Sequence, residues 1–231
     1  MEKNNVWLIT AKANLHVGNE NISSYELIDK AIQRDALTGL PNINSSSLKG
    51  AINEHVTQVT EITSEDRKHI FGADKLEKNN KSTQKGFYTF FDANILFLPI
   101  QDDTTLFKLV TCDAVIQQFI DRVNLFGSTF TKESFKSKME SLKFTYEEIA
   151  NDKFVEYCSN EELPIIARNY LEEGESKNLW YEQVLPRETV FYTLILPDSD
   201  SSLLEKEINN KIIQIGANAT IGYGYCKFQN I

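Results

Sequence analysis

The sequence is poor in cysteine, and its three cysteines, Cys112, Cys158 and Cys226, are widely spaced. An odd number at such spacing gives neither a disulfide framework nor a zinc pattern, so we expect a reducing, cytoplasmic location. Long apolar runs are also absent. The longest, ILFLPI, spans residues 95–100, whereas a helix needs roughly 20 apolar residues to cross a bilayer. Residues 1–10, MEKNNVWLIT, lack the apolar stretch of a signal peptide. We therefore expect no membrane partner.

Positive charge is scarce, because 24 Lys and Arg face 33 Asp and Glu, for a net charge of −9. Taken whole, this argues against a free nucleic-acid binder, which should be basic. The distribution changes that conclusion. Residues 145–182 hold ten acidic and three basic side chains, which leaves the other 193 residues nearly neutral. Any site for a polyanion must then lie outside 145–182, or be local and specific.

What is present is ordinary for a folded chain, since 41% of the 231 residues are hydrophobic and 25% are charged. The length fits one large domain. Period and composition predict strands at 6–10, 87–98, 106–110 and 189–196. Helices are predicted at about 47–60, at 113–126 with Asp113 as a cap, and at 201–211, and a hairpin-like strand pair at 212–228. This mixture favours an α+β fold of the ferredoxin-like, RRM-like type.

Two long segments interrupt this pattern. Residues 11–44 are predicted to form a long loop with short ordered pieces, and loops of that length in compact domains tend to be functional. Residues 73–86 are polar and lysine-rich and are predicted to be a surface loop. The acidic stretch 145–186 has no clear period and is predicted to be an inserted subdomain.

The first candidate site is the start of the helix near residue 47. Ser45, Ser46 and Ser47 stand where unpaired N–H groups and the helix dipole attract anions. Lys49 would fit poorly with the dipole in the first turn unless an anion were bound there, and Gly50 permits close backbone approach. Together these residues suit a phosphate backbone. The alternative is an ordinary serine-capped helix with a solvated lysine.

The second candidate is the glycine-rich segment 214–224. Gly216, Gly222 and Gly224 flank Asn218 and Thr220, and such a loop can present backbone N–H groups to phosphates. It is neither a P-loop nor a dinucleotide fingerprint, because no Gly-Lys-Ser/Thr and no helix follows it. The alternative is a glycine-rich turn between two C-terminal strands.

The third candidate is a set of polar residues in the 11–44 loop, namely His16, Asp29, Gln33, Arg34 and Asp35. A loop carboxylate beside a phosphate could hold Mg²⁺, which prefers oxygen ligands, and His16 could act as a general acid or base. The alternative is surface charge. Of the other histidines, His55 is predicted to be a core residue and His69 a surface residue.

Five segments resemble one known family. They occur in the order LHVGN (15–19), IDKAIQRDALTGLPNINSSSLKGAI (28–52), FFDANILFLPI (90–100), LWYEQVLPRETVFY (179–192) and IQIGANATIGYGYC (213–226). Together they resemble the RAMP-type backbone RNase subunit of type III-B CRISPR (Cmr) effector complexes. The chain departs from that family at Asn53 and Tyr223, where a basic residue is frequent, and at Val184, where tyrosine is frequent.

The resemblance implies an RRM-like palm with an inserted thumb. Residues 1–144 would be the N-terminal part of the palm with surface insertions, 145–186 the acidic inserted thumb, and 187–231 the C-terminal strands that complete the palm and carry the glycine-rich RNA-binding loop. Copies would stack head to tail along a CRISPR guide RNA, beside other Cmr subunits. Each copy would cut a complementary single-stranded target RNA once, so that the cuts fall at regular intervals. The reaction would need a divalent cation, Mg²⁺ or Mn²⁺.

The resemblance also assigns residues. Asp29 is the residue on which cleavage would depend, as catalytic group and metal ligand, and His16 and Glu182 join it as catalytic candidates. RNA contacts are expected from Gln33, Arg34, Ser45, Ser46, Ser47, Lys49, Gly216, Asn218, Thr220 and Gly222. Contacts to the RNA backbone read no sequence, which suits a protein that accepts any guide.

Three other functions stay open on the sequence. The chain could be a non-catalytic RNA-binding backbone subunit with the same fold. It could process the guide precursor, a reaction that needs no metal. It could also be a small-molecule enzyme that uses the 216–224 loop to bind a phosphate.

Overall fold

Four antiparallel strands form the centre of the molecule. The computed structural model describes residues 5–18, 28–59, 61–72, 85–197 and 203–231. The central strands are β1 (Val6–Ala11), β4 (Ala93–Asp102), β9 (Val190–Pro197) and β11 (Tyr225–Asn230), and they lie side by side in the order β11-β1-β9-β4. This is the order of a ferredoxin-like βαββαβ unit. The α+β, ferredoxin-like prediction is confirmed.

The sheet extends beyond this unit on both sides. β10 (Ile212–Gln214) pairs with β11, while β5 (Leu106–Cys112) pairs with β4 and β6 (Tyr146–Ile149) joins β5 in parallel. The short strands β2 (Asn42–Ile43) and β3 (Tyr88–Phe90) pair with β4 and β9. The result is a nine-stranded sheet within the described residues.

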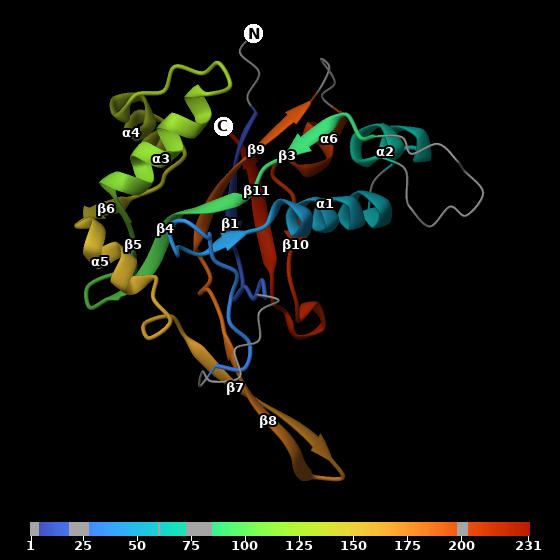
Figure 1. Cartoon of the computed structure of the whole chain (residues 1–231), viewed down its shortest axis with the longest axis vertical. Helices are drawn as coiled ribbons and strands as arrows, with labels where there is room; N and C mark the ends of the chain where they lie inside the picture. Colours follow the sequence, from blue (N-terminus) through green and yellow to red (C-terminus); the bar gives the residue numbers. More distant parts are fainter. Residues whose placement is uncertain (1–4, 19–27, 60, 73–84, 198–202) are drawn as a thin grey trace.

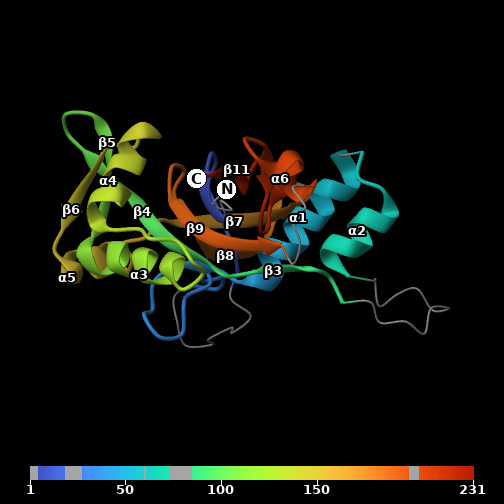
Figure 2. The same ribbon diagram turned by 90° about the horizontal axis from the view of Figure 1, so that it is seen from above.

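Helices gather at the two ends of the sheet. Figure 2 shows α1 (Ser45–Val59) and α2 (Ser64–Phe71) at one end, and α3 (Asp113–Asn124), α4 (Lys132–Ser141) and α5 (Asn151–Tyr157) at the other. The remaining helices are α6 (Leu203–Ile208) and the 3₁₀ turn η1 (Ala219–Ile221). Within the described residues, no helix is long and apolar enough to span a membrane.

Both groups of helices contribute apolar side chains to one core. α1 buries Leu48, Ile52 and Val56, which recur at helical spacing along one face. From α3, the ring of Phe119 meets that of Tyr192 on β9 at 4.9 Å, edge to face. Cys112, Cys158 and Cys226 are free and buried, and burial raises the pKa of Cys158 and of Cys226 to about 12.

A β-hairpin projects from this body. β7 (Ile165–Glu172) and β8 (Glu175–Gln183) pair with each other in a separate two-stranded sheet, and Figure 1 shows them extending away from the large sheet. The 145–186 stretch has no clear period in sequence, yet it forms regular elements, namely β6, α5, β7 and β8. Residues 146–149 belong to the main sheet, and only the hairpin projects. Most hairpin side chains are exposed on both faces, so the strands lack the alternation of apolar and polar residues that marks a half-buried strand.

Most other sequence predictions agree with the structure. The strands near 6–10, 106–110 and 189–196 are present, and 87–98 divides into β3 and β4. Asp113 is not a cap, because Cys112 is the N-cap residue and makes no side-chain capping bond. Nothing in the sequence patterns predicted α2, α4 or α5, which are short and mostly polar. Of the surface loop predicted at 73–86, residues 73–84 lie outside the described residues.

Candidate functional site

Three successive residues at the end of β8 hold three different parts of the chain together. At Tyr181, the backbone N–H donates to Asp29 Oδ2 at 2.7 Å, and the carbonyl accepts from the N–H groups of Asp29 and Lys30, both at 3.1 Å. The start of the 28–34 segment therefore pairs with the end of β8, through an isolated parallel bridge between Lys30 and Glu182. The Asp29 carboxylate is exposed but held at one oxygen, which leaves its other oxygen free for a ligand.

Glu182, the next residue, points the opposite way and is fully buried. Arg168 Nε lies 2.8 Å from Glu182 Oε2, and the side-chain amide of Asn218 donates to Oε1. Burying a carboxylate is costly unless it is paired and hydrogen-bonded. Arg168 supplies the ion-pair contact at Oε2 and Asn218 the hydrogen bond at Oε1, so each oxygen of the buried carboxylate has a polar neighbour.

His16 is attached to the third residue, Gln183. His16 Nδ1 lies 2.7 Å from the Gln183 carbonyl oxygen and 3.6 Å from Glu182 Oε1. Only an N–H can bond a carbonyl oxygen, so Nδ1 carries a proton and Nε2 is left for a substrate. Gly18 lies against this nitrogen, since a Cβ there would be 3.2 Å from Nε2, and the His16 side chain is 4% exposed. His16, Asp29 and Glu182 are thus brought together at one strand end.

The glycine-rich loop closes over His16 from the other side. The N–H of Ala217 donates to the His16 carbonyl at 3.0 Å. At Gly216, φ is +78° and a Cβ would meet that same oxygen at 2.2 Å, so only glycine fits. Asn218 lies in the left-handed region and gives its side chain to Glu182, while Thr220 and Gly222 are exposed.

A chain of backbone hydrogen bonds connects this site to the start of α1. Gln33 donates its N–H to Val17 O at 2.7 Å, and Asn42 donates to Gln33 O at 3.2 Å. Arg34 is engaged inside the protein, since its guanidinium donates to the carbonyls of Gly39 and Cys158. Burial lowers the pKa of Arg34.

α1 begins two residues earlier than expected, so Ser45, Ser46 and Ser47 form its first turn. The N–H of Ser45 donates to Asp92 Oδ1 at 2.5 Å, so a carboxylate of the chain itself already occupies part of the anion position. Ser46 and Ser47 are exposed, and the Lys49 ammonium lies 5.9 Å from the centre of the Phe90 ring. The RNA contacts at these residues stay predictions.

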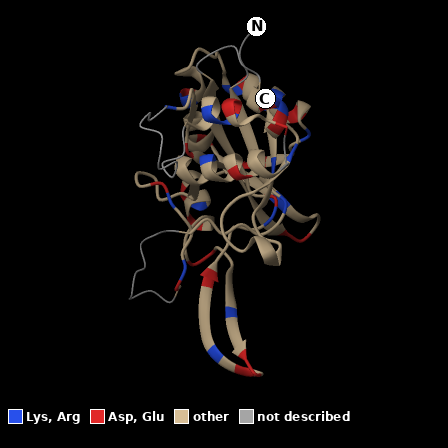
Figure 3. Cartoon of the chain, turned by 90° about the vertical axis from the view of Figure 1, so that its right-hand side faces the viewer, with Lys and Arg blue, Asp and Glu red and all other residues tan. Residues whose placement is uncertain are grey.

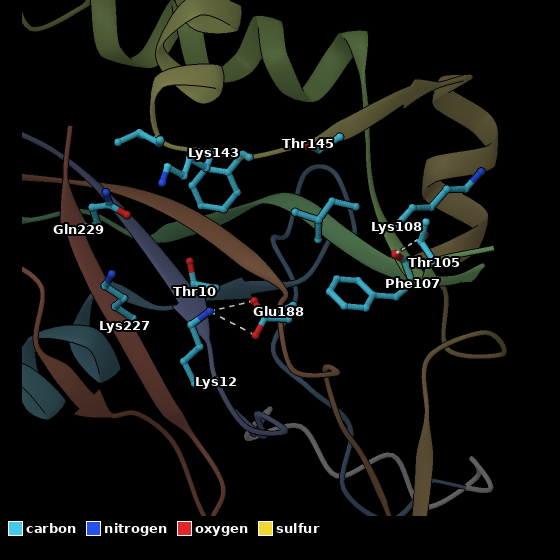
Figure 4. Close-up of a pocket in the computed structure, with 13 residues that line it drawn as sticks. Thr10, Lys12, Thr105, Phe107, Lys108, Lys143, Thr145, Glu188, Lys227 and Gln229 are labelled. Carbon is cyan, nitrogen blue, oxygen red and sulfur yellow. Dashed lines mark hydrogen bonds and ion pairs between the residues drawn. The ribbon is translucent and has the colours of Figure 1, made fainter. Parts of the chain in front are cut away.

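A separate pocket of about 530 Å³ lies between β1, β5, β11 and the α4–β6 connection (Figure 4). It contains four lysines, of which Lys12 pairs with Glu188 and Lys108 with Glu147. It includes none of the three candidate catalytic residues. This pocket adds a basic concavity to an acidic chain, apart from those three residues.

The hairpin carries acidic charge at its tip, where Glu172, Glu173 and Glu175 lie within four residues (Figure 3). Exposed apolar side chains accompany them, with Tyr170, Leu171 and Leu179 between 54% and 59% exposed. Like charges at the tip disfavour phosphate, and flat apolar side chains suit contact with bases.

The site offers acid–base groups but no preformed metal cage. Among the described residues, no three His, Cys, Asp or Glu side chains gather as a metal site. Glu182 does not fit as a ligand, because Arg168 and Asn218 hold its two oxygens. Asp29 does fit, since Mg²⁺ is frequently held by one or two carboxylates together with substrate phosphates and water.

The sequence matches the RAMP superfamily over residues 8–227, and the chain belongs to that superfamily.

Within it, the chain is similar to Cmr4. It is 28% identical to the CRISPR system Cmr endoribonuclease Cmr4 of Pyrococcus furiosus, over 87% of each chain. The crystal structure of oligomeric Cmr4 from P. furiosus superimposes with a TM-score of 0.74 at 22% identity, covering 97% of this chain and 96% of that one. A chain of the type III-B Cmr-beta complex bound to cognate target RNA gives 0.72 at 20% identity, covering 97% and 95%. The two structures show that the fold is shared.

Sequence reasoning missed the groups that hold Glu182. Arg168 was counted only as one of three basic residues in an acidic segment, and Asn218 was assigned to RNA. A prediction of two paired strands in 165–183 would have placed Arg168 and Glu182 on the same face of a hairpin. Diagonal neighbours on paired strands are close enough for long side chains to meet.

Proposed function

We propose that the chain is a backbone subunit of a type III-B CRISPR effector complex that binds guide RNA and cuts the paired target RNA. The observation that supports this most is the joint attachment of Asp29, Glu182 and His16 to Tyr181, Glu182 and Gln183 of β8. A subunit that only supported RNA would have no need to bury a paired carboxylate 3.6 Å from a histidine.

The RNA would lie across the start of α1 and the 216–224 loop, with phosphates near Ser46, Ser47 and Lys49. The hairpin would press its exposed apolar side chains between bases and bend the backbone. Bending aligns the 2′-oxygen, the phosphorus and the leaving 5′-oxygen, and such alignment contributes several kcal/mol, up to about 10.

The chemical step would be attack of the 2′-hydroxyl on the adjacent phosphorus. The new P–O2′ bond forms as the P–O5′ bond breaks, which gives a 2′,3′-cyclic phosphate and a 5′-hydroxyl. Asp29 would accept the 2′-hydroxyl proton. His16 would act as the imidazolium, with a proton on each ring nitrogen, and would give its Nε2 proton to the leaving 5′-oxygen. Glu182 would stabilise the imidazolium at 3.6 Å.

We include a divalent cation, Mg²⁺ or Mn²⁺, in this proposal. Asp29 would hold it through the carboxylate oxygen that Tyr181 leaves free, and in that case the 2′-hydroxyl proton would pass to water instead of to Asp29. When bound, the cation would neutralise charge on the scissile phosphate.

The test is target cleavage by the assembled complex with Asp29→Ala and Asp29→Asn. Either change removes the ionised carboxylate, so cutting should fall on the order of 10²-fold or more at every site, and EDTA should stop the wild type. Guide and target binding should survive, because other residues contact phosphate. Asp103→Ala, an exposed aspartate in the β4–β5 turn, is the matched control and should cut normally.

Each alternative predicts a different result. If the Asp29 variants cut at the wild-type rate, the assignment is wrong. A wild-type complex that binds target and never cuts would indicate a non-catalytic backbone subunit. Cleavage of guide precursor in EDTA would indicate a processing enzyme.

A further inference from the structure

Arg168 lies diagonally across the hairpin from Glu182. Ile166 is opposite Glu182 and Arg168 is opposite Trp180, so all four side chains share one face of the hairpin. That face is the less exposed one and turns toward the body of the protein. Diagonal pairs on neighbouring strands have Cβ atoms about 7–8 Å apart, a gap that a long arginine side chain can span.

The contact between Arg168 and Glu182 is mostly buried. Arg168 Nε is 2.8 Å from Glu182 Oε2, with the arginine side chain 16% and the glutamate side chain 1% exposed. The guanidinium also lies over the ring of Tyr223, 4.7 Å from its centre. This second contact fixes the arginine against the glycine-rich loop, since guanidinium groups stack on aromatic faces. Arg168 is therefore shared by the hairpin, the loop and the buried carboxylate.

Glu182 passes this restraint to His16. Oε2 lies 2.8 Å from Arg168 Nε and Oε1 accepts a hydrogen bond from Asn218, so both contacts favour the orientation in which Oε1 is 3.6 Å from His16 Nδ1. Within the described residues, the His16 side chain makes one hydrogen bond, from Nδ1 to the Gln183 carbonyl. If the Glu182 carboxylate turned away, the orientation of the His16 ring and the negative charge near it would both change.

We infer that Arg168 is a positioning residue of the reaction, acting through Glu182 on His16. This inference rests on the proposed ribonuclease function. Arg168 orients the carboxylate and offsets part of its charge near the imidazole, and it links the hairpin that engages the target to the group that protonates the leaving oxygen.

The experiment compares single-turnover target cleavage by complexes carrying Arg168→Ala, Arg168→Lys or Glu182→Gln. Groups that orient a reactive residue typically contribute 10–100-fold. Arg168→Ala should lower the rate at saturating target by about that factor and leave the half-saturating target concentration unchanged. Lysine keeps the charge but not the planar fork, so it should restore part of the rate. Lys177→Ala is the control, because that lysine pairs with Glu175 on the exposed part of the hairpin.

Two further readouts separate this role from the alternatives. In the double variant Arg168→Ala/Glu182→Gln, the rate should equal that of Glu182→Gln alone, since the two residues act in series. The chain has three histidines, so the ring signals of His16 can be assigned by NMR with a His16→Gln variant. They should shift in Arg168→Ala and stay in place in Lys177→Ala.

Several results would overturn the inference. One is weaker target binding with an unchanged rate at saturation, which would make Arg168 a direct RNA contact. A second is a double variant whose loss of cleavage rate is the product of the two single losses. A third is that the His16 ring signals do not shift in Arg168→Ala. The NMR readout needs no cleavage, so a wild-type complex that does not cut would refute the proposed function while the Arg168–His16 link is still decided.

Discussion

Gly216 and Gly222 belong to one loop and have similar backbone angles, with φ of +78° and +86°. Their surroundings differ. A Cβ at Gly216 would lie 2.2 Å from the His16 carbonyl oxygen, whereas a Cβ at Gly222 meets nothing within 4 Å. At the residue scale, one glycine is needed for its conformation and the other also for the approach of two backbones at the site.

This difference predicts unequal costs for the same substitution. Gly222→Ala should lower the free energy of unfolding by about 1 kcal/mol, the cost of a left-handed alanine. Gly216→Ala should cost about 3 kcal/mol or more, because the clash must also move His16. Urea unfolding of the free chain measures both. Equal losses would mean that the loop moves away from His16 at little cost.

At the scale of elements, the hairpin differs from every other strand pair described here. Its strands are held by each other and by the 28–34 segment, not by the core, and its outer part exposes Leu171 and Leu179. Isolated hairpins of this kind are marginal alone. The element is therefore anchored at its base, where Glu182 and Gln183 are buried, and is free to meet a partner at its tip.

Replacing both exposed leucines should separate stability from function. Leu171→Ser/Leu179→Ser should change the free energy of unfolding by no more than about 0.5 kcal/mol, since exposed positions contribute little. Target cleavage in the complex should fall, because the apolar contact with bases is lost. Leu163→Ala, at a residue 4% exposed just before β7, is the contrast and should cost about 2–5 kcal/mol. Undiminished cleavage by the double variant would exclude the tip from target engagement.

At the scale of the whole molecule, the shape is asymmetric. A projecting acidic hairpin stands at one end, and the C-terminus lies toward the other (Figure 1). Surfaces that differ in this way suit heterologous contacts, which build open filaments instead of closed dimers. Acidic total charge also suits a subunit that shares basic surface with its neighbours.

We predict that the number of copies grows with the length of the guide RNA. Mass photometry of complexes on a short guide and on one extended by several binding intervals should show added mass in steps of one 26.4 kDa chain. A stable dimer without RNA that does not grow on longer guides would contradict this prediction.

The sequence by itself determined the strongly patterned elements and the family. VWLIT and TVFYTLIL form β1 and β9 as predicted, because apolar β-branched runs have few alternatives to a buried strand. The serine-led segment forms α1, since its apolar residues recur at helical spacing. Whether such a segment forms a strand or a helix depends mainly on the residues next to it in sequence, and these can be read from one chain.

Only the tertiary structure decided what surrounds the reactive groups. Asp29, Glu182 and His16 are separated by up to 166 positions, and their meeting depends on the pairing of the 28–34 segment with β8. The sequence did not predict the hairpin, because both of its faces are largely exposed and its strands show no apolar alternation. The role of Arg168 was missed for the same reason. A buried ion pair is a property of the space between elements, where burial and opposite charge meet. The pattern of apolar residues shows the period within one element, but it does not show which side chains of different elements meet.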